Sequence, residues 1–197
     1  GMQWIRDFLV SLDSQPLPVH NDQRITQLTE GWGAAGMAEA MYAQSMWPVL
    51  RQAISDAKGG NGDGLMELAG QYAERTSGGA YSGNLLQAIN AVNCLDRTDT
   101  ADIAKVESNA KAFSVDAPTW GTFLAWGSAI CGVWPVSATG TPHKVSAQGS
   151  GPIVVVGTTR DPATIYEWAV RLRQQLSNAV LITFDGDGHT AYTRSNA

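Results

Sequence analysis

The sequence predicts an α/β fold rich in helices, in which a helical region is followed by one strand–helix–strand unit. Two observations predict it: helical periodicity over residues 2–113, and two continuous apolar, β-branched runs near the C-terminus. The chain has 197 residues, 44% of them apolar, which suffices for a compact domain with a core. We expect residues 1–140 to form the helical region and residues 141–197 the strand–helix–strand unit.

Apolar residues of the first region recur at helical spacing. The first segment runs from Trp4 to Leu12 and ends before the two prolines of residues 15–18. Further helical faces are expected over residues 47–54, 65–72, 85–92 and 103–113. We expect Ser45 and Thr100 to cap the helices that begin near 47 and 103. None of these segments alternates as a strand would, so a helical assembly is predicted.

The character of the sequence changes after residue 140. A polar stretch rich in Gly, Ser and Pro precedes the run Ile153–Gly157, and a helical segment then leads to a second run, Ala179–Phe184. Continuous apolar runs of this kind are typical of buried parallel strands. Two parallel strands alone leave faces and edges without cover. We therefore expect the isolated chain to find sheet neighbours by self-association, as a homodimer. The alternative is that the helices of the first region fold over the strands.

Composition excludes several classes of function. The chain has 13 Lys and Arg against 18 Asp and Glu, a formal net charge of −5 with no basic stripe, so nucleic acid is not an expected partner. No apolar run approaches the roughly 20 residues of a membrane span, and no signal peptide follows Met2. Asp185–Gly188 resembles the start of a calcium loop, but Thr190 and Asn196 occupy positions that need Gly and Glu. No metal or cofactor is expected.

The carboxyl ends of the two predicted strands carry the residues that matter most for function. Asp161 follows the first strand and His189 the second, 28 residues apart (189 − 161), which is the separation that one helix and one strand require. Ligands of open α/β sheets bind beyond these strand ends. A carboxylate there can fix an imidazole tautomer and stabilise its charged form, while the other ring nitrogen accepts a proton from a nucleophile. The alternative is a solvated histidine in a Gly-rich turn.

Two segments around these residues, 155–169 and 185–192, carry a family resemblance, with weaker matches at 15–18, 88–96 and 131–135. The whole chain resembles the C-terminal part of the actinobacterial tripeptidyl-aminopeptidase-like α/β-hydrolases, which are secreted serine peptidases. The resemblance implies that the helices form a cap, that Asp161 is the acid of a Ser-His-Asp triad and that His189 is its base. Ile165 stands where the family usually has Pro, which affects only the start of the following helix.

The serine nucleophile of that family is absent from this sequence. Its Gly-x-Ser-x-Gly elbow lies upstream of the cap, and no window of these residues fits the pattern. Ser82, Ser128 and Ser150 each have a neighbouring glycine but lack glycine at both required positions. If Met2 is the true start, we expect a remnant, a misassigned reading frame or half of a split enzyme. Otherwise the chain is part of a longer peptidase.

Three further residues complete the candidate set. Cys94 and Cys131 suit one disulfide, which indicates secretion or the cell envelope, although two buried free thiols are the alternative. Asp96 is a candidate for binding the ammonium group of a peptide substrate. Burying that ammonium group without an anionic partner is unfavourable, and the carboxylate of Asp96 can be the partner. Its alternative role is to stabilise a helix end or the cap.

Two functions of different classes follow. The main one is the cap and C-terminal segment of a secreted serine peptidase that acts on peptide N-termini, with Asp161 orienting His189 as general base and acid. This chain alone is then expected to be inactive. The alternative is a non-catalytic helical binding module, a hydrolase remnant whose strand–helix–strand tail closes its fold.

Overall fold

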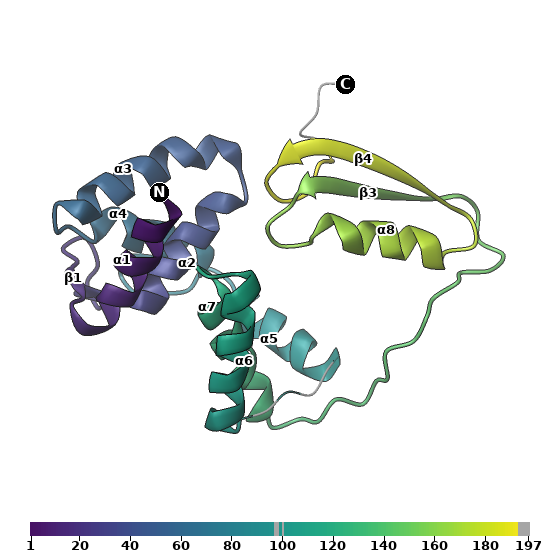
Figure 1. The fold of residues 1–197 in the computed structure, drawn as a ribbon, viewed down its shortest axis with the longest axis horizontal. Coiled ribbons are helices and arrows are strands. Elements are labelled where there is room, and N and C mark those ends of the chain that lie inside the picture. Colours follow the sequence, from purple (N-terminus) through teal and green to yellow (C-terminus); the bar gives the residue numbers. More distant parts are fainter. Residues whose placement is uncertain (97–98, 100, 193–197) are drawn as a thin grey trace. The chain divides into compact units, whose positions relative to one another are not determined.

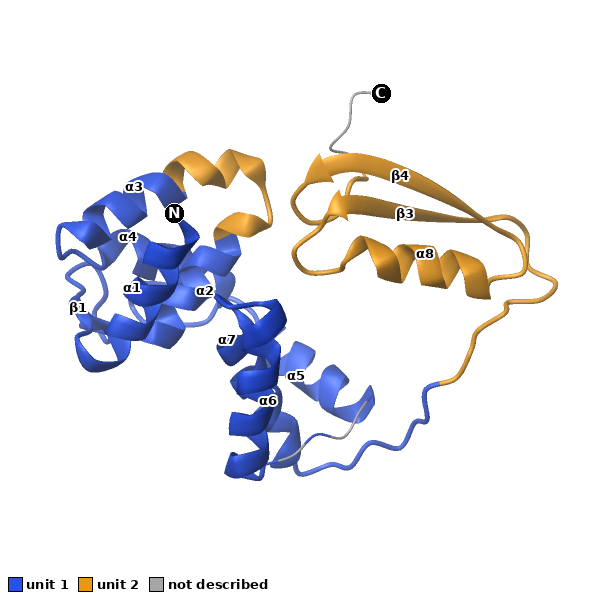
Figure 2. Cartoon of the chain, viewed as in Figure 1, with its two compact units in different colours: residues 1–39, 50–142 blue, residues 40–49, 143–197 orange. Residues whose placement is uncertain are grey.

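The structure, a computed structural model, describes residues 1–96, 99 and 101–192 and forms two compact units (Figure 2). The helical unit contains residues 1–39 and 50–142, and the strand unit contains residues 40–49 and 143–197. The expected boundary lay at residue 140, and residues 40–49 were expected in the helical region. In the structure this short segment instead groups with the strands, which are more than 100 residues away in the sequence.

The helical unit consists mainly of helices, as the periodicity predicts. Their bounds are α1 (Met2–Ser14), α2 (Glu30–Met41), α3 (Trp47–Lys58), α4 (Asp63–Tyr72), α5 (Leu85–Asp96), α6 (Ile103–Asp116), α7 (Gly121–Ser128) and the 3-10 helix η2 (Ala129–Gly132). The C-terminal end of α2 and the N-terminal end of α3 lie within residues 40–49 and therefore belong to the strand unit. The sequence reasoning identified neither α2 nor α7, because both are apolar around most of their circumference and lack a clear polar face.

The helical unit also contains one short strand pair, which the sequence did not indicate. The strands β1 (Leu17–Pro18) and β2 (Gln27–Leu28) form a short antiparallel pair, with Leu17 opposite Leu28. Two-residue strands are too short to show alternation, and prolines at 16 and 18 favour an extended backbone there. Leu28 is fully buried, as are Leu12, Met37, Leu65, Leu68 and Val106 in other elements of the unit.

The expected caps also differ from those observed. Ser45 lies inside the 3-10 helix η1 (Gln44–Met46), which leads directly into α3 without a side-chain cap. Thr100 lies outside the described residues. The cap of α6 is Asp102, whose Oδ1 accepts a hydrogen bond from the backbone N–H of Lys105 at 3.3 Å. Asp is as good an N-cap as Ser and better than Thr, so the nearer Asp102 takes the position.

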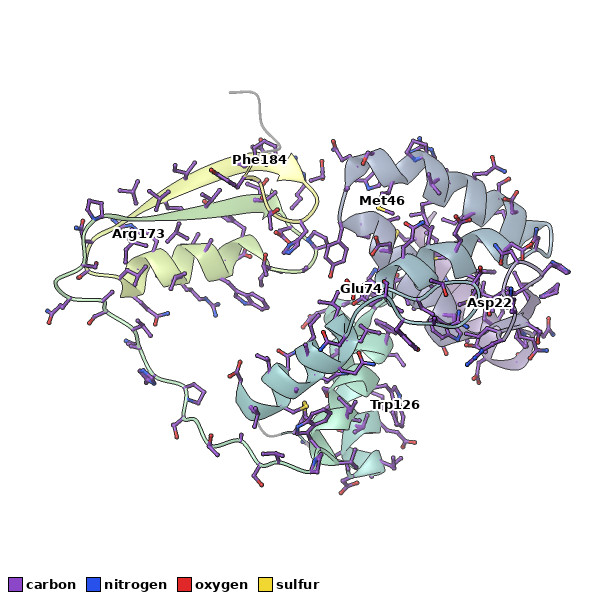
Figure 3. All side chains as sticks on the ribbon, turned by 180° about the vertical axis from the view of Figure 1, so that it is seen from behind. Asp22, Met46, Glu74, Trp126, Arg173 and Phe184 are labelled. Carbon is purple, nitrogen blue, oxygen red and sulfur yellow. A yellow bond between two sulfur atoms is a disulfide. The ribbon has the colours of Figure 1, made fainter. Side chains whose placement is uncertain are left out.

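The helical unit contains a covalent link and a buried ion pair. Cys94 of α5 and Cys131 of η2 form a disulfide, with Cα atoms 4.8 Å apart. Arg75 donates hydrogen bonds to both carboxylate oxygens of Asp22, and both side chains are almost completely buried. Figure 3 shows Asp22 within this unit. The guanidinium of Arg75 holds the pKa of Asp22 well below its usual range and outweighs the opposing effect of burial.

The strand unit is built on a parallel pair, β3 (Ile153–Arg160) and β4 (Ala179–Asp187), connected by α8 (Tyr166–Gln175). The helix packs on one face of the pair, as Figure 1 shows. Gly157 permits this packing, because a Cβ atom there would lie 2.8 Å from Cβ of Ala169 and 2.9 Å from Cδ2 of Tyr166. The strand–helix–strand prediction is confirmed, and α8 begins one residue after Ile165.

The opposite face of this pair is apolar and open. Val154 is aligned with Val180, and Val156 with Ile182, so all four side chains lie on the face away from α8. They are between 42% and 57% exposed. Among the described residues of the strand unit, no helix covers this face. In the part of the chain that the structure describes, no helix is both long and apolar enough to cross a membrane.

Candidate active site

Asp161 and His189 meet at the carboxyl edge of the parallel pair. Asp161 directly follows β3, and His189 lies two residues after β4. Both strands run in the same direction, so both segments leave the sheet at one edge. The distance from Nδ1 of His189 is 3.0 Å to Oδ1 of Asp161 and 3.1 Å to Oδ2.

The carboxylate of Asp161 is buried and held by backbone donors. Its Oδ1 accepts hydrogen bonds from the N–H groups of Ala163 at 2.9 Å and Thr164 at 2.8 Å. Its Oδ2 accepts from the hydroxyl of Thr164 and from the N–H of Thr190, both at 3.0 Å. Because the first two donors follow two and three positions after Asp161, the turn is a local consequence of the Asp side chain.

These bonds set the protonation state of Asp161. Burial opposes its ionisation, but the N–H groups of Thr164, Thr190 and Ala163 and the ring of His189 outweigh burial. The pKa of Asp161 therefore lies well below its usual range. The group is a carboxylate at neutral pH and remains one when its partner is charged.

An ionised carboxylate can only accept hydrogen bonds, so Nδ1 of neutral His189 carries the ring proton. The lone pair of the neutral ring then lies on Nε2, the nitrogen that can accept another proton. The His189 side chain is 30% exposed, whereas that of Asp161 is 3% exposed. The pair thus consists of a buried, fixed anion and a partly accessible base.

The loop that carries His189 has an unusual backbone. Gly188 has φ +96° and Thr190 has φ +62°, so a residue in the left-handed region stands on each side of His189. The N–H of His189 donates to the backbone carbonyl of Tyr42 at 2.8 Å. The Tyr42 ring packs edge-on against the imidazole, with ring centroids 5.3 Å apart. Residues 40–49 therefore support the loop from outside the strand–helix–strand segment.

Sequence reasoning missed three contributors to this site. Thr164 could have been found, since a hydroxyl three positions after an Asp at a strand end commonly closes a turn. Tyr42 and Gln44 carried no signal, because more than 140 residues separate them from the segment they contact. Gln44 donates to Oδ2 of Asp187 at 2.9 Å.

Asp96, the remaining predicted site residue, is the last residue of α5 and is exposed. It belongs to the helical unit, whereas Asp161 and His189 belong to the strand unit. Among the described residues, no group of three or more His, Cys, Asp or Glu could hold a metal ion.

A parallel strand pair covered by a helix, with an Asp and a His at its carboxyl edge, is the arrangement of the C-terminal end of an α/β-hydrolase. The chain has the helix-rich, partial form of that fold. Comparison with known proteins shows which proteins the chain is similar to. Residues 117–197 match the model of a family described as TAP-like protein.

Named relatives agree with this match. The chain is 41% identical to carboxylesterase B of Mycobacterium tuberculosis over 167 residues, which are 82% of this chain and 31% of the relative. It is 38% identical to the serine protease Hip1 of the same organism over 162 residues, 79% of this chain and 30% of that protein. The tripeptidyl aminopeptidase of Streptomyces lividans is 29% identical over 160 residues, 77% and 29% of the two chains.

The chain thus spans about 30% of the length of the curated relatives that it matches. These relatives are named as hydrolases of the serine protease, esterase and aminopeptidase kinds. The resemblance to the tripeptidyl-aminopeptidase-like α/β-hydrolases is confirmed.

Proposed function

We propose that this chain supplies the acid and base of a serine hydrolase, with Asp161 orienting His189, and that its helices form the cap. The observation that carries the proposal is the pair of short contacts between Nδ1 of His189 and a buried carboxylate of lowered pKa. A binding module would not need a partly exposed histidine that is fixed in one tautomer. The named relatives support the same class of reaction.

In the proposed reaction each group has a definite task. Nε2 of His189 accepts the proton of a serine hydroxyl as the oxygen attacks an acyl carbon, and Nδ1–H keeps its bond to Asp161. Asp161 stays ionised and stabilises the imidazolium that forms. His189 then returns the proton to the leaving group, and the two transfers repeat in reverse when water hydrolyses the acyl-enzyme.

The serine and the oxyanion donors must come from hydrolase residues outside this sequence. The open apolar face of Val154, Val156, Val180 and Ile182 supports this requirement, since such a face is covered in a complete sheet. The coding sequence next to that of this chain is expected to contain an in-frame Gly-x-Ser-x-Gly. In a protein that joins this chain to the residues that carry the serine, called the joined protein below, a fluorophosphonate should label that serine. His189→Ala should abolish labelling. Labelling unchanged by His189→Ala would contradict the proposal.

The substrate that we propose is a peptide with a free N-terminus, held through its ammonium group by Asp96. A carboxylate at the C-terminal end of a helix opposes the helix dipole, so the stability of α5 does not account for Asp96. Asp96→Asn in the joined protein should lower kcat/KM for free N-termini by about tenfold or more, as loss of a charged hydrogen bond does. N-acetylated peptides serve as the control, and equal effects on both substrates would exclude the role.

We also propose that this protein is exported to the cell envelope or secreted. The Cys94–Cys131 disulfide supports this, because disulfides persist in oxidising compartments and are rare in the reducing cytosol. Fractionation of the native host cells tests the location, and a protein recovered only from the cytosol would contradict it.

A further inference from the structure

We propose that Asp187 is a positioning residue for His189, which it serves by connecting the histidine loop to two separate parts of the strand unit. This inference rests on the proposed role of His189. Asp187 is the last residue of β4 and lies two positions before His189.

The two carboxylate oxygens of Asp187 have different partners. Oδ1 accepts a hydrogen bond from Nε of Arg160 at 2.7 Å, and Oδ2 accepts one from Nε2 of Gln44 at 2.9 Å. Arg160 is the residue immediately before Asp161, so the first bond ties the base-bearing loop to the acid-bearing strand end. Gln44 lies two residues after Tyr42, whose carbonyl binds the N–H of His189. Asp187 thus joins both supports of the histidine loop.

Further contacts hold Arg160 in place for this purpose. Its Nη1 donates to Oδ1 of Asp185 at 2.8 Å and to Oγ1 of Thr159 at 3.3 Å. Thr159 in turn donates to Asp185 at 2.9 Å. Asp187 precedes His189 in the chain, whereas Thr190, whose N–H binds Asp161, follows it, so the network holds the loop on the N-terminal side of His189.

A role in stability alone does not explain this network. The Arg160 side chain is 54% exposed and that of Asp187 is 29% exposed, and ion pairs in water contribute little to stability. A cavity of about 440 Å³ lies beside them, lined by Gln44, Arg160 and Asp187 among others. Truncating Asp187 therefore removes a surface bond and leaves no buried void. What it does remove is the connection between the two supports.

The test uses nuclear magnetic resonance of this chain with 15N-labelled histidine. The Nδ1–H proton of His189 is hydrogen-bonded to a buried carboxylate and should give a slowly exchanging signal. The 15N chemical shifts of the ring should be those of the Nδ1–H tautomer. Asp187→Ala removes both hydrogen bonds and should accelerate exchange of that proton about fivefold or more, since loss of even one bond worth about 1 kcal/mol gives that factor. Gln44→Ala should have a smaller effect in the same direction. The midpoint of thermal unfolding should hardly change.

Gln52→Ala is the matched control, because Gln52 makes an equivalent exposed bond to Asp56 at 2.8 Å within α3. Asp187→Glu, which keeps the charge, should restore slow exchange in part. Unchanged exchange in Asp187→Ala would overturn the positioning role, while the pair of Asp161 and His189 would stand if Asp161→Asn abolished the signal. A wild-type chain without this signal would instead contradict the proposed function.

Discussion

One carboxylate, that of Asp161, binds both the ring of His189 through Nδ1 and the backbone N–H of the next residue, Thr190. The orientation of the imidazole and the path of its loop are therefore fixed by the same buried anion. Because the pKa of that anion is lowered, the arrangement persists through the neutral pH range. Such preorganisation is what a general base requires before its nucleophile is in place.

The buried ion pair of the helical unit gives a prediction on pH and stability. The pKa of Asp22 is lowered in the folded state, so its contribution is fully present above the unfolded pKa near 4 and is lost as pH falls through the folded value. Asp22→Asn should reduce the free energy of unfolding by about 3 kcal/mol at pH 7, since it leaves Arg75 buried without a counter-charge. The loss should shrink below pH 4. Urea unfolding at pH 7 and pH 3 measures it.

Asp7→Asn is the control for that experiment, because Asp7 is exposed on α1 and its carboxylate accepts hydrogen bonds from Nε2 of Gln3, one turn earlier on the same helix. It should change stability by less than about 0.5 kcal/mol at either pH. A loss in Asp22→Asn that stays constant from pH 7 to pH 3 would contradict the assignment of Asp22 as the titrating group.

The disulfide gives a second prediction. Cys94 and Cys131 are 37 residues apart, and closing a loop of that length contributes about 4 kcal/mol in the chain-entropy model. Reduction should therefore lower the unfolding temperature of the helical unit markedly. Thiol titration of the unreduced, denatured protein should detect no free sulfhydryl. Two free thiols, or identical stability of the reduced and oxidised forms, would disprove the expected contribution.

The separation in sequence between contacting residues determined how much of the fold and of the candidate site could be predicted from the sequence. Asp161 and His189 were identifiable because each follows a continuous apolar, β-branched run typical of a buried strand, and parallel strands bring their carboxyl ends together. The short pair β1–β2 was missed because two residues carry no periodicity. The support from Tyr42 and Gln44 was missed because it is tertiary: no local pattern shows that residues 40–49 lie against a loop near residue 188.

The isolated chain should not hydrolyse esters or peptides at an enzymatic rate. It carries the proposed base and the proposed orienting acid, but no window of its sequence fits Gly-x-Ser-x-Gly, so the serine and the oxyanion donors of that elbow are lacking. Assays with p-nitrophenyl esters and peptide anilides test this directly. Turnover that is abolished both by His189→Ala and by a fluorophosphonate would show that another serine of this chain has taken the role.

Self-association of the isolated chain is the fourth prediction. Val156 and Ile182 lie on the open face of the strand pair, and burying about 600 Å² of such surface contributes roughly 15 kcal/mol before entropy. We expect a homodimer at micromolar concentration in light scattering. Ile182→Lys should shift it to the monomer, whereas Gln52→Lys should not. A sharp monomer mass for the unchanged chain, with both strands protected from amide exchange, would contradict this prediction.

The central claim is that His189 is the base of a serine hydrolase, and kinetics test it most directly. In a protein that joins this chain to its serine-bearing hydrolase residues, His189→Ala should lower kcat by about 10³-fold or more. Asp161→Asn should lower kcat by a comparable factor, because the amide favours the wrong tautomer of the His189 imidazole. His143→Ala, which changes a histidine of the polar stretch before β3, should leave kcat within about twofold of the wild-type value. A His189→Ala protein that kept kcat within tenfold of wild type would contradict the account.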